Sequence, residues 1–331
     1  MERELRILFS CAGRRVALIE CFRAAANRLK QPVRLFGADL SLTAPAMHCL
    51  DKVHTVPRVN DDGYVDALLD IVRKHKIDML VPLLDHELPP LAAARDAFES
   101  LGCSALIASP ETIGICRDKM ATFEFLRAND IDCPDTRSWK EVNERKRHRF
   151  PYFMKPRFGS AAVGNHVIRT REELEFFGRR VNDAIIQEML VGPEFTTDVY
   201  CGLDGKPRCA VPRKRLEVRG GEVSKGITVD QPEVIELALR TADKLGGGPG
   251  VVTVQCMHHK EERLCVLEIN PRFGGGVPLA IAAGADFPRW LMMEKLGRRP
   301  RFAGRPFKPD VAMLRYDAAV FVTRASDKLG L

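Results

Sequence analysis

The sequence contains no C-x-x-C pair, although it has ten cysteines. The cysteines are scattered along apolar stretches, where a thiol behaves as a small core residue. This pattern indicates a reducing compartment rather than a disulfide framework. No apolar run approaches the roughly 20 residues of a membrane span, and the N-terminus M-E-R-E-L-R-I-L-F-S lacks the apolar segment of a signal peptide. We therefore expect a cytoplasmic protein with no membrane partner.

Two common nucleotide-binding loops are also missing. The predicted strand Arg6–Ser10 is followed by C-A-G-R-R, whose single glycine, Gly13, does not make the G-x-G-x-x-G of dinucleotide-binding folds. The helix start here could still lie near an anion. No G-K-[ST] opens a helix, which excludes a Walker A loop. The net charge is a modest +7, and the basic clusters are not interleaved with aromatic residues. We therefore expect no nucleic-acid partner.

The length of 331 residues and the hydrophobic content of 45% indicate a globular protein of two or three domains. Residues 1–110 alternate strands with helices, which predicts a doubly wound parallel sheet. Ligands of such sheets lie beyond the carboxyl ends of the strands. At this edge, the side chain of Asp39 would either bind a ribose hydroxyl or stabilise a turn or helix N-cap. Asp85 and Glu87 precede the predicted helix Leu88–Ser100. They would either cap this helix or lie at the opening of a substrate site.

Two further sections follow, 111–186 and 187–331. The first has a helix over Asp118–Asn129, and its basic, proline-marked stretch Asp132–Arg149 is interpreted as linker and turn. The second is dominated by antiparallel strands. Those expected are Phe195–Leu203, Pro207–Arg215, Val251–His258, Leu264–Ile269 and the tail segment Val311–Val322. The fold class is therefore α/β, with a small middle subdomain and an α+β C-terminal part.

A hairpin is predicted in the middle section. The strands Tyr152–Lys155 and Asn165–Arg169 flank the loop P-R-F-G-S-A-A-V-G. The small residues at its tip would let backbone amides reach phosphate oxygens, and Lys155 would add positive charge. These tip residues are Gly159, Ser160 and Gly164. A plain flexible hairpin is the alternative.

The most specific chemistry lies in the stretch Leu264–Gly276. Strict strand alternation would place Leu264, Val266, Glu268 and Asn270 on one face, and Cys265, Leu267 and Ile269 on the other. Glu268 and Asn270 are then neighbouring oxygen donors, which suit Mg²⁺ completed by phosphate oxygens. Arg272, just beyond, suits a phosphoryl group or a carboxylate. Gln255 on the facing strand would be a third metal ligand or a surface glutamine. The alternative for the whole stretch is an edge strand whose polar face meets solvent.

Taken together, these residues resemble the ATP-grasp enzymes, and within them the carbamoyl-phosphate-synthetase-like branch of single-chain proteins. The resemblance covers nearly the whole chain, in the family's order. It implies that adenine meets Glu188 and the backbone of Met189 and Leu190, and that Glu194 holds the ribose. The nucleotide-contacting residues that it implies are Lys119, Lys155, Gly159, Ser160, Gly164, Gln187, Glu188, Met189, Leu190 and Glu194. The implied metal ligands are Gln255, Glu268 and Asn270, and the implied catalytic residues are Arg272 and Lys155.

The resemblance also implies ATP and Mg²⁺ as cofactors, with Mn²⁺ as the substitute ion. A small-molecule carboxylate would attack the γ-phosphate, and an amine or other nucleophile would displace phosphate from the acyl phosphate. The alternatives are a phosphotransferase that stops at phosphorylation and a nucleotide-binding regulatory module. The sequence does not decide which of Arg213, Lys214 and Arg215 reaches the site. Family analogy suggests a homodimer. The chain has one ATP-grasp unit, whereas the synthetase subunit has two, so carbamoyl phosphate synthesis by this chain alone is not expected.

Overall fold

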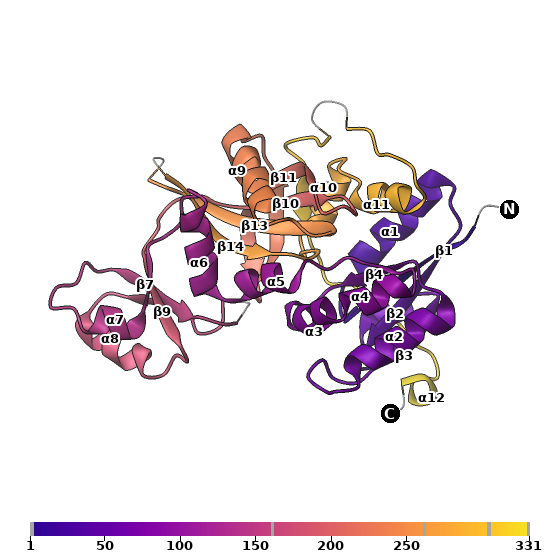
Figure 1. Ribbon diagram of the computed structural model, residues 1–331, viewed down its shortest axis with the longest axis horizontal. Coiled ribbons are helices and arrows are strands. Elements are labelled where there is room, and N and C mark those ends of the chain that lie inside the picture. The colour runs from indigo at the N-terminus through magenta and orange to yellow at the C-terminus, as the bar shows by residue number, and fades with distance from the viewer. Residues whose placement is uncertain (1–2, 160–161, 261–262, 303–305, 330–331) are drawn as a thin grey trace.

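A parallel sheet forms the N-terminal part of the molecule (Figure 1). The computed structural model describes residues 3–159, 162–260, 263–302 and 306–329. The sheet has the order β3-β2-β1-β4-β5, and every neighbouring pair is parallel. Its strands and helices are β1 (Leu5–Ser10), α1 (Val16–Leu29), β2 (Val33–Asp39), β3 (Lys52–Thr55), α2 (Tyr64–His75), β4 (Met79–Pro82), α3 (Leu88–Ala93), α4 (Arg95–Ser100) and β5 (Ser104–Ala105). Two separate apolar clusters cover its two faces, with Phe9 in one and Leu8 in the other. The predicted doubly wound sheet is confirmed.

A small antiparallel sheet, here called the lid sheet, projects from the other end of the molecule (Figure 1). It has the order β6-β9-β7-β8. Its elements are β6 (Thr136–Ser138), α7 (Trp139–Asn143), β7 (Tyr152–Pro156), β8 (His166–Ile168), α8 (Arg171–Gly178) and β9 (Ala184–Glu188). Met154 on β7 is buried in the core that α7 and α8 share with the sheet. Because strand side chains alternate, Lys155 points to the opposite face of the lid sheet.

The large sheet, with the order β14-β13-β10-β11-β12-β15, is antiparallel throughout. Its strands are β10 (Glu194–Cys201), β11 (Pro207–Arg219), β12 (Glu222–Thr228), β13 (Gly250–His259), β14 (Arg263–Asn270) and β15 (Ala312–Leu314). Three helices pack against one face: α5 (Pro110–Arg117), α6 (Lys119–Ala128) and α9 (Pro232–Lys244). On the other face, Tyr200 and Val211 belong to the cluster that includes α1. On this second face, Tyr200 packs against Phe287 and Trp290, which belong to the helical segment 287–295 that contacts α1.

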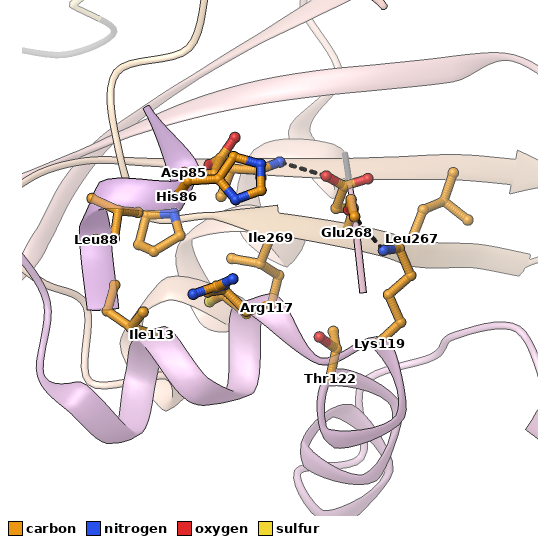
Figure 2. A pocket seen from close by; sticks show the side chains of 14 residues that line it. Asp85, His86, Leu88, Ile113, Arg117, Lys119, Thr122, Leu267, Glu268 and Ile269 are labelled. Atoms are coloured by element: carbon orange, nitrogen blue, oxygen red, sulfur yellow. Dashed lines mark hydrogen bonds between the residues drawn. The ribbon is translucent and has the colours of Figure 1, made fainter. Parts of the chain in front are cut away.

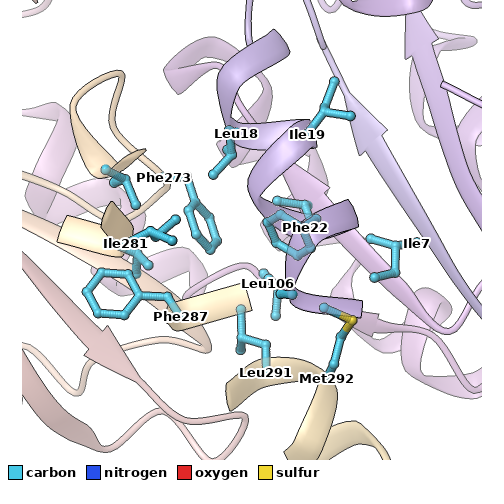
Figure 3. Packing of buried hydrophobic residues seen from close by; sticks show 14 of the residues in the cluster. Ile7, Leu18, Ile19, Phe22, Leu106, Phe273, Ile281, Phe287, Leu291 and Met292 are labelled. Atoms are coloured by element: carbon cyan, nitrogen blue, oxygen red, sulfur yellow. The ribbon is translucent and has the colours of Figure 1, made fainter. Parts of the chain in front are cut away.

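A shared core joins the parallel sheet to the C-terminal segment (Figure 3). Helix α1 packs here against α10 (Val277–Ala282) and α11 (Phe287–Lys295). The ring of Phe22 on α1 lies 5.8 Å, centroid to centroid, from Phe273 and 5.0 Å from Phe9. Phe273 directly follows Arg272. The core therefore fixes the beginning of α1 and the segment after Arg272 relative to each other.

Several sequence predictions are corrected by the structure. The single helix expected over Leu88–Ser100 is two helices, because the backbone leaves helical geometry at Ala94. The expected linker Asp132–Arg149 contains β6 and α7. Helix α7 begins in a capping box in which Ser138 Oγ accepts from the amide of Glu141. The spacing S-x-x-E was the signal that could have revealed it.

The large sheet also differs from its prediction. The strand expected over Pro207–Arg215 extends to Arg219, and β12, which was not predicted, follows across a turn. That turn is Gly220-Gly221, with φ of +58° and +79°, and a Gly-Gly pair is a hairpin signal. In the tail segment Val311–Val322 only Ala312–Leu314 is a strand, because its pairing with β12 stops there.

All ten cysteines are free thiols, and six of them are buried. This agrees with their predicted role as small core residues. Within the described part of the chain, no helix is both long enough and apolar enough to cross a membrane.

Candidate active site

A β-bulge on β14 sets the direction of the candidate metal ligands. Gln255 pairs with Glu268, but the next residue of β13, Cys256, pairs with Val266, so Leu267 is an extra residue. Val266 consequently joins Ile269 in the core under the helices, whereas Glu268 and Asn270 leave that core. The strict alternation expected from the sequence is therefore wrong at Val266, because the bulge shifts the pattern by one residue.

The donor set on these strands fits a magnesium ion that is shared with phosphate. Asn270 Nδ2 donates to Glu268 Oε1 at 3.0 Å, and Gln255 lies directly opposite Glu268. The described residues include no group of three His, Cys, Asp or Glu side chains that could hold a metal. One carboxylate and two amides make a weak site by themselves. Mg²⁺ tolerates this, because it keeps few protein ligands and takes phosphate oxygens for the rest. The assignment of Gln255, Glu268 and Asn270 stays a prediction.

Two lysines lie near the Glu268 carboxylate. Lys119 begins α6, and its Nζ donates to the carbonyl of Gly159 at 2.9 Å, which ties the hairpin loop to the helix. Lys155, on the free face of the lid sheet, is 7% exposed. Burial lowers the pKa of Lys155 to about 8; the charge of Glu268 opposes this shift, and that of Lys119 adds to it. Burial likewise lowers the pKa of Lys119. Both ammonium groups are therefore short of compensating negative charge.

We expect the affinity for ATP to fall as the pH rises above about 8, the pKa of Lys155. Phosphate oxygens favour the charged lysine, so above this pH ATP binding must be accompanied by proton uptake. Titration calorimetry with Mg·ATP between pH 7 and 9 should show this dependence. Lys155→Arg, which stays charged, should remove it. Lys155→Ala should weaken ATP binding at every pH and lower the rate. An unchanged ATP affinity in Lys155→Ala would show that the hairpin does not cover the phosphates.

Arg272 forms a bidentate ion pair with Asp85. Its Nε and Nη2 each donate to Asp85 at 2.6 Å, and the exposed fractions of the two side chains are 14% and 23%. Glu87 has a different role: it is fully buried and accepts from the amides of Leu83 and Leu84. The sequence left open whether these acids cap a helix or face a substrate site, and the two roles fall on different residues. Glu87 caps the turn, and Asp85 extends into the site.

The basic triplet on β11 is divided by strand alternation. The Arg213 side chain is buried and forms an ion pair with Asp198, which also accepts from Thr253 Oγ1 at 3.1 Å. Arg215 pairs with Glu194 at 2.8 Å. Lys214 lies on the opposite face, over the ring of Phe195. Sequence reasoning did not assign Asp198 or Thr253 to the site. The available signal was the polar alternation of E-F-T-T-D in β10.

The predicted adenine-binding segment links the lid sheet to the large sheet. Met189 and Leu190 connect β9 to β10. The side chain of Gln187 is buried and donates to Thr136 Oγ1 at 2.8 Å, and Glu188 accepts from Arg263 at 3.1 Å. These two side chains are therefore engaged within the protein, which leaves the backbone as the part available to a base. At the hairpin tip, Gly159 and Gly164 have φ of +126° and +77°. Ser160 lies outside the described residues.

Asp39 holds the loop after β1. Its Oδ2 accepts from the amide of Gly13 at 2.8 Å, and its Oδ1 accepts from the amide of Ser41 at 3.4 Å. Of the two roles left open by the sequence, the structure shows the turn role.

A small open pocket lies between α5, α6 and the end of β14 (Figure 2). Figure 2 shows Lys119 and Thr122 on one wall and Glu268 on the facing wall, with Asp85 and His86 at the far end. The pocket thus brings together the predicted metal ligands Glu268 and Asn270, Lys119 and the tip residue Gly159.

Comparisons with known proteins agree on the fold. Residues 7–106 match the family model described as PylC-like, N-terminal domain, and residues 180–317 match the model described as ATP-grasp in the biosynthetic pathway with Ter operon. The L-amino acid ligase from Bacillus licheniformis has a TM-score of 0.69 at 19% identity, covering 89% of this chain and 75% of that one. The biotin carboxylase domain of Hydrogenobacter thermophilus 2-oxoglutarate carboxylase, solved with MgADP and bicarbonate, has a TM-score of 0.72 at 16% identity, covering 94% and 74%.

Curated relatives match over shorter stretches. The D-alanine–D-alanine ligase of Bacillus anthracis is 26% identical over 147 residues, which are 40% of this chain and 47% of that ligase. The D-alanine–D-alanine ligase A of Bacillus cereus is 26% identical over 191 residues, covering 54% and 62%. The chain thus spans about half the length of the curated relatives it matches. Its three sheets have the arrangement of the ATP-grasp fold. Residues 180–317 thus match an ATP-grasp family model, and the chain as a whole has the ATP-grasp fold.

Proposed function

We propose that this protein is an ATP- and Mg²⁺-dependent ligase that joins a small-molecule carboxylate to an amine or a similar nucleophile, with release of ADP and phosphate. The observation that carries the proposal is that three kinds of group lie close together. They are the metal-binding oxygens of Glu268 and Asn270, the two lysines that lack compensating negative charge (Lys119 and Lys155), and the Arg272–Asp85 ion pair. A module that only binds nucleotide has no need of all three.

The chain's own charges suit phosphoryl transfer. Bound Mg²⁺ would supply Lewis-acid neutralisation of the phosphate charge. Lys119 and Lys155 offer fixed positive charge from α6 and the lid sheet, and Arg272 offers it from the end of β14. Fixed cations stabilise a transition state best where negative charge develops, because they need not reorganise during the step.

The reaction that these groups support has two steps. A carboxylate oxygen of the first substrate attacks the γ-phosphorus of ATP, the bond to the β-phosphate oxygen breaks, and ADP leaves. The amine of the second substrate then attacks the acyl carbon. The acyl–oxygen bond breaks, phosphate leaves with the electron pair, and the amine loses a proton. The acyl phosphate must be kept from water. The hairpin between β7 and β8, which is tied to α6 through Lys119 and Gly159, would exclude water.

The test is a screen for the release of ADP and phosphate from Mg·ATP, with amino acids and small carboxylic acids added singly and in pairs. Release that requires one particular acid–amine pair would support the ligase and identify its substrates. Release with one acid alone, together with a stable phosphorylated product, would make the protein a phosphotransferase. Tight ATP binding without turnover with every pair would favour a regulatory module.

Five finer expectations belong with this proposal. The ten free thiols support a reducing compartment such as the cytoplasm. A homodimer, Mn²⁺ as a substitute ion and the carbamoyl-phosphate-synthetase-like branch stay predictions from the family resemblance. The subdomain boundaries at 110 and 186 also stay predictions. Helices α5 and α6, which follow residue 110, pack against the large sheet rather than the lid sheet.

A further inference from the structure

A second cluster of arginines lies beside the candidate active site. Arg15 follows β1 and precedes α1, and its Nη1 lies 3.0 Å from Glu222 Oε1 on β12. Arg315, just after β15, donates from Nη1 to the other oxygen, Glu222 Oε2, at 3.0 Å. We call Arg15, Glu222 and Arg315 the arginine triad. It joins the carboxyl end of the parallel sheet to the edge of the large sheet, a region where open α/β sheets bind ligands.

The triad has more positive than negative charge. Two guanidinium groups share one carboxylate, whereas Arg272 and Arg213 each have an acid of their own, Asp85 and Asp198. Burial lowers the pKa of Arg15; the charges of Glu222 and Asp85 raise it, and those of Arg272 and Arg315 lower it further. Burial would raise the pKa of Glu222, but Arg15 and Arg315 hold it below its usual value. The three side chains by themselves thus carry one positive charge in excess, and Arg15 is the most buried of them.

The loop after Arg272 runs directly over this cluster. A Cβ atom on Gly275 would lie 2.5 Å from Arg15 Nη1 and 3.0 Å from Glu222 Oε2, and one on Gly276 would lie 2.7 Å from Arg213 Nε. The two glycines let the loop backbone lie against these side chains, and a larger residue would have to displace their flexible ends. Gly275 is three residues from Arg272, so the Cα atoms of these two residues lie within about 11 Å of each other. The core around Phe22 and Phe273 fixes this spacing.

An unpaired donor points to a ligand in the same place. Arg213 is 3% exposed, and its Nε has no hydrogen-bond partner within the described structure. Buried donors are seldom left unpaired, because each one costs free energy when it lacks an acceptor. Arg213 Nε lies under Gly276, next to the residue that covers the triad. An anionic group of the substrate would satisfy both the missing negative charge and the missing acceptor.

We propose that the arginine triad binds a carboxylate of the substrate that does not react, so that the enzyme acts on small dicarboxylic acids, including acidic amino acids. This inference rests on the proposed ligase function. One carboxylate of the substrate is phosphorylated near Glu268 and Arg272, while the other lies between Arg15 and Arg315. Glu222 keeps the two guanidinium groups in place and sets their net charge at one positive unit.

The test is titration calorimetry on the full chain with Mg²⁺ and ADP present. The probes are succinate, glutarate and adipate, each compared with its monoamide. We expect at least one diacid to bind about 10-fold more tightly than its monoamide, since a hydrogen-bonded charge pair is lost in the amide. Arg15→Gln and Arg315→Gln should each reduce this preference to near unity. Glu222→Gln should preserve or increase it, because it removes a competing carboxylate. ADP affinity serves as the control for folding of each variant.

Two results would overturn the inference: no diacid binds more tightly than its monoamide, or Arg15→Gln and Glu222→Gln weaken binding by the same factor, as loss of a structural contact would. Different results would reject the proposed ligase function. Diacid binding without ADP release for any nucleophile would reject the ligase and leave the anion site. ADP release with monocarboxylates only would support the ligase and reject the diacid as its substrate.

Discussion

Replacement of Glu268 by alanine is expected to lower ATP turnover by about 10³-fold or more while the fold stays intact. Glu268 is the single carboxylate among the predicted metal ligands, and its side chain accepts a hydrogen bond from Asn270. Losing it would leave two amides, which neither hold Mg²⁺ nor balance the charges of Lys119 and Lys155. The measurement is the rate of ADP release with the substrate pair that the screen identifies, together with thermal unfolding.

The matched control for this variant is Glu99→Ala. Glu99 lies on α4, is exposed and pairs with Arg95 on the same helix. Surface changes of this kind usually alter stability by no more than about 0.5 kcal/mol, and the rate should not change. Turnover at the normal rate in Glu268→Ala would contradict the metal assignment. Raising the Mg²⁺ concentration should partly restore Glu268→Ala if the lost function is metal binding.

Arg272→Ala is the second change with a large expected effect. We expect turnover to fall by about 10²- to 10³-fold, as when a fixed donor to developing charge is removed. Stability should also fall, because Asp85 would keep its charge without its bidentate partner in a half-buried site. Arg272→Lys should retain part of the rate, since it keeps the charge but not the two parallel bonds.

A double variant separates the two effects of Arg272. In Arg272→Ala with Asp85→Ala no charge is left unpaired, so the free energy of unfolding should recover relative to Arg272→Ala alone. The rate should stay low, because the arginine acts on the transferring group. Recovery of the rate in the double variant would show that Arg272 only positions the loop, and normal turnover in Arg272→Ala would exclude it from the chemistry.

The candidate site residues could be predicted from the sequence because each lies in a local sequence pattern. Glu268 and Asn270 are two positions apart on one strand, and Arg272 comes after the proline that ends it. The register between neighbouring strands was harder to predict from the sequence. The bulge at Leu267, which sends Val266 into the core, depends on pairing with β13 and leaves no local signal.

The pairings between distant residues were not accessible at all. Asp85 meets Arg272 across 187 positions of the chain, and the sequence could place Asp85 only near a helix start. The division of Arg213 and Arg215 between Asp198 and Glu194 follows from the β10–β11 register. Arg15 and Arg315 come together only because β15 pairs with β12 and α1 packs against the segment after Arg272.

The sequence by itself determined the doubly wound sheet, the hairpin with its lysine, and the strand that carries Glu268 and Asn270. These follow from side-chain periodicity and from the conformational limits of glycine and proline, which act over a few residues. Only the tertiary structure decided which acid neutralises which arginine, and therefore where positive charge remains for a substrate. Charge balance is a property of groups within a few ångströms in space, and here those groups come from opposite ends of the chain.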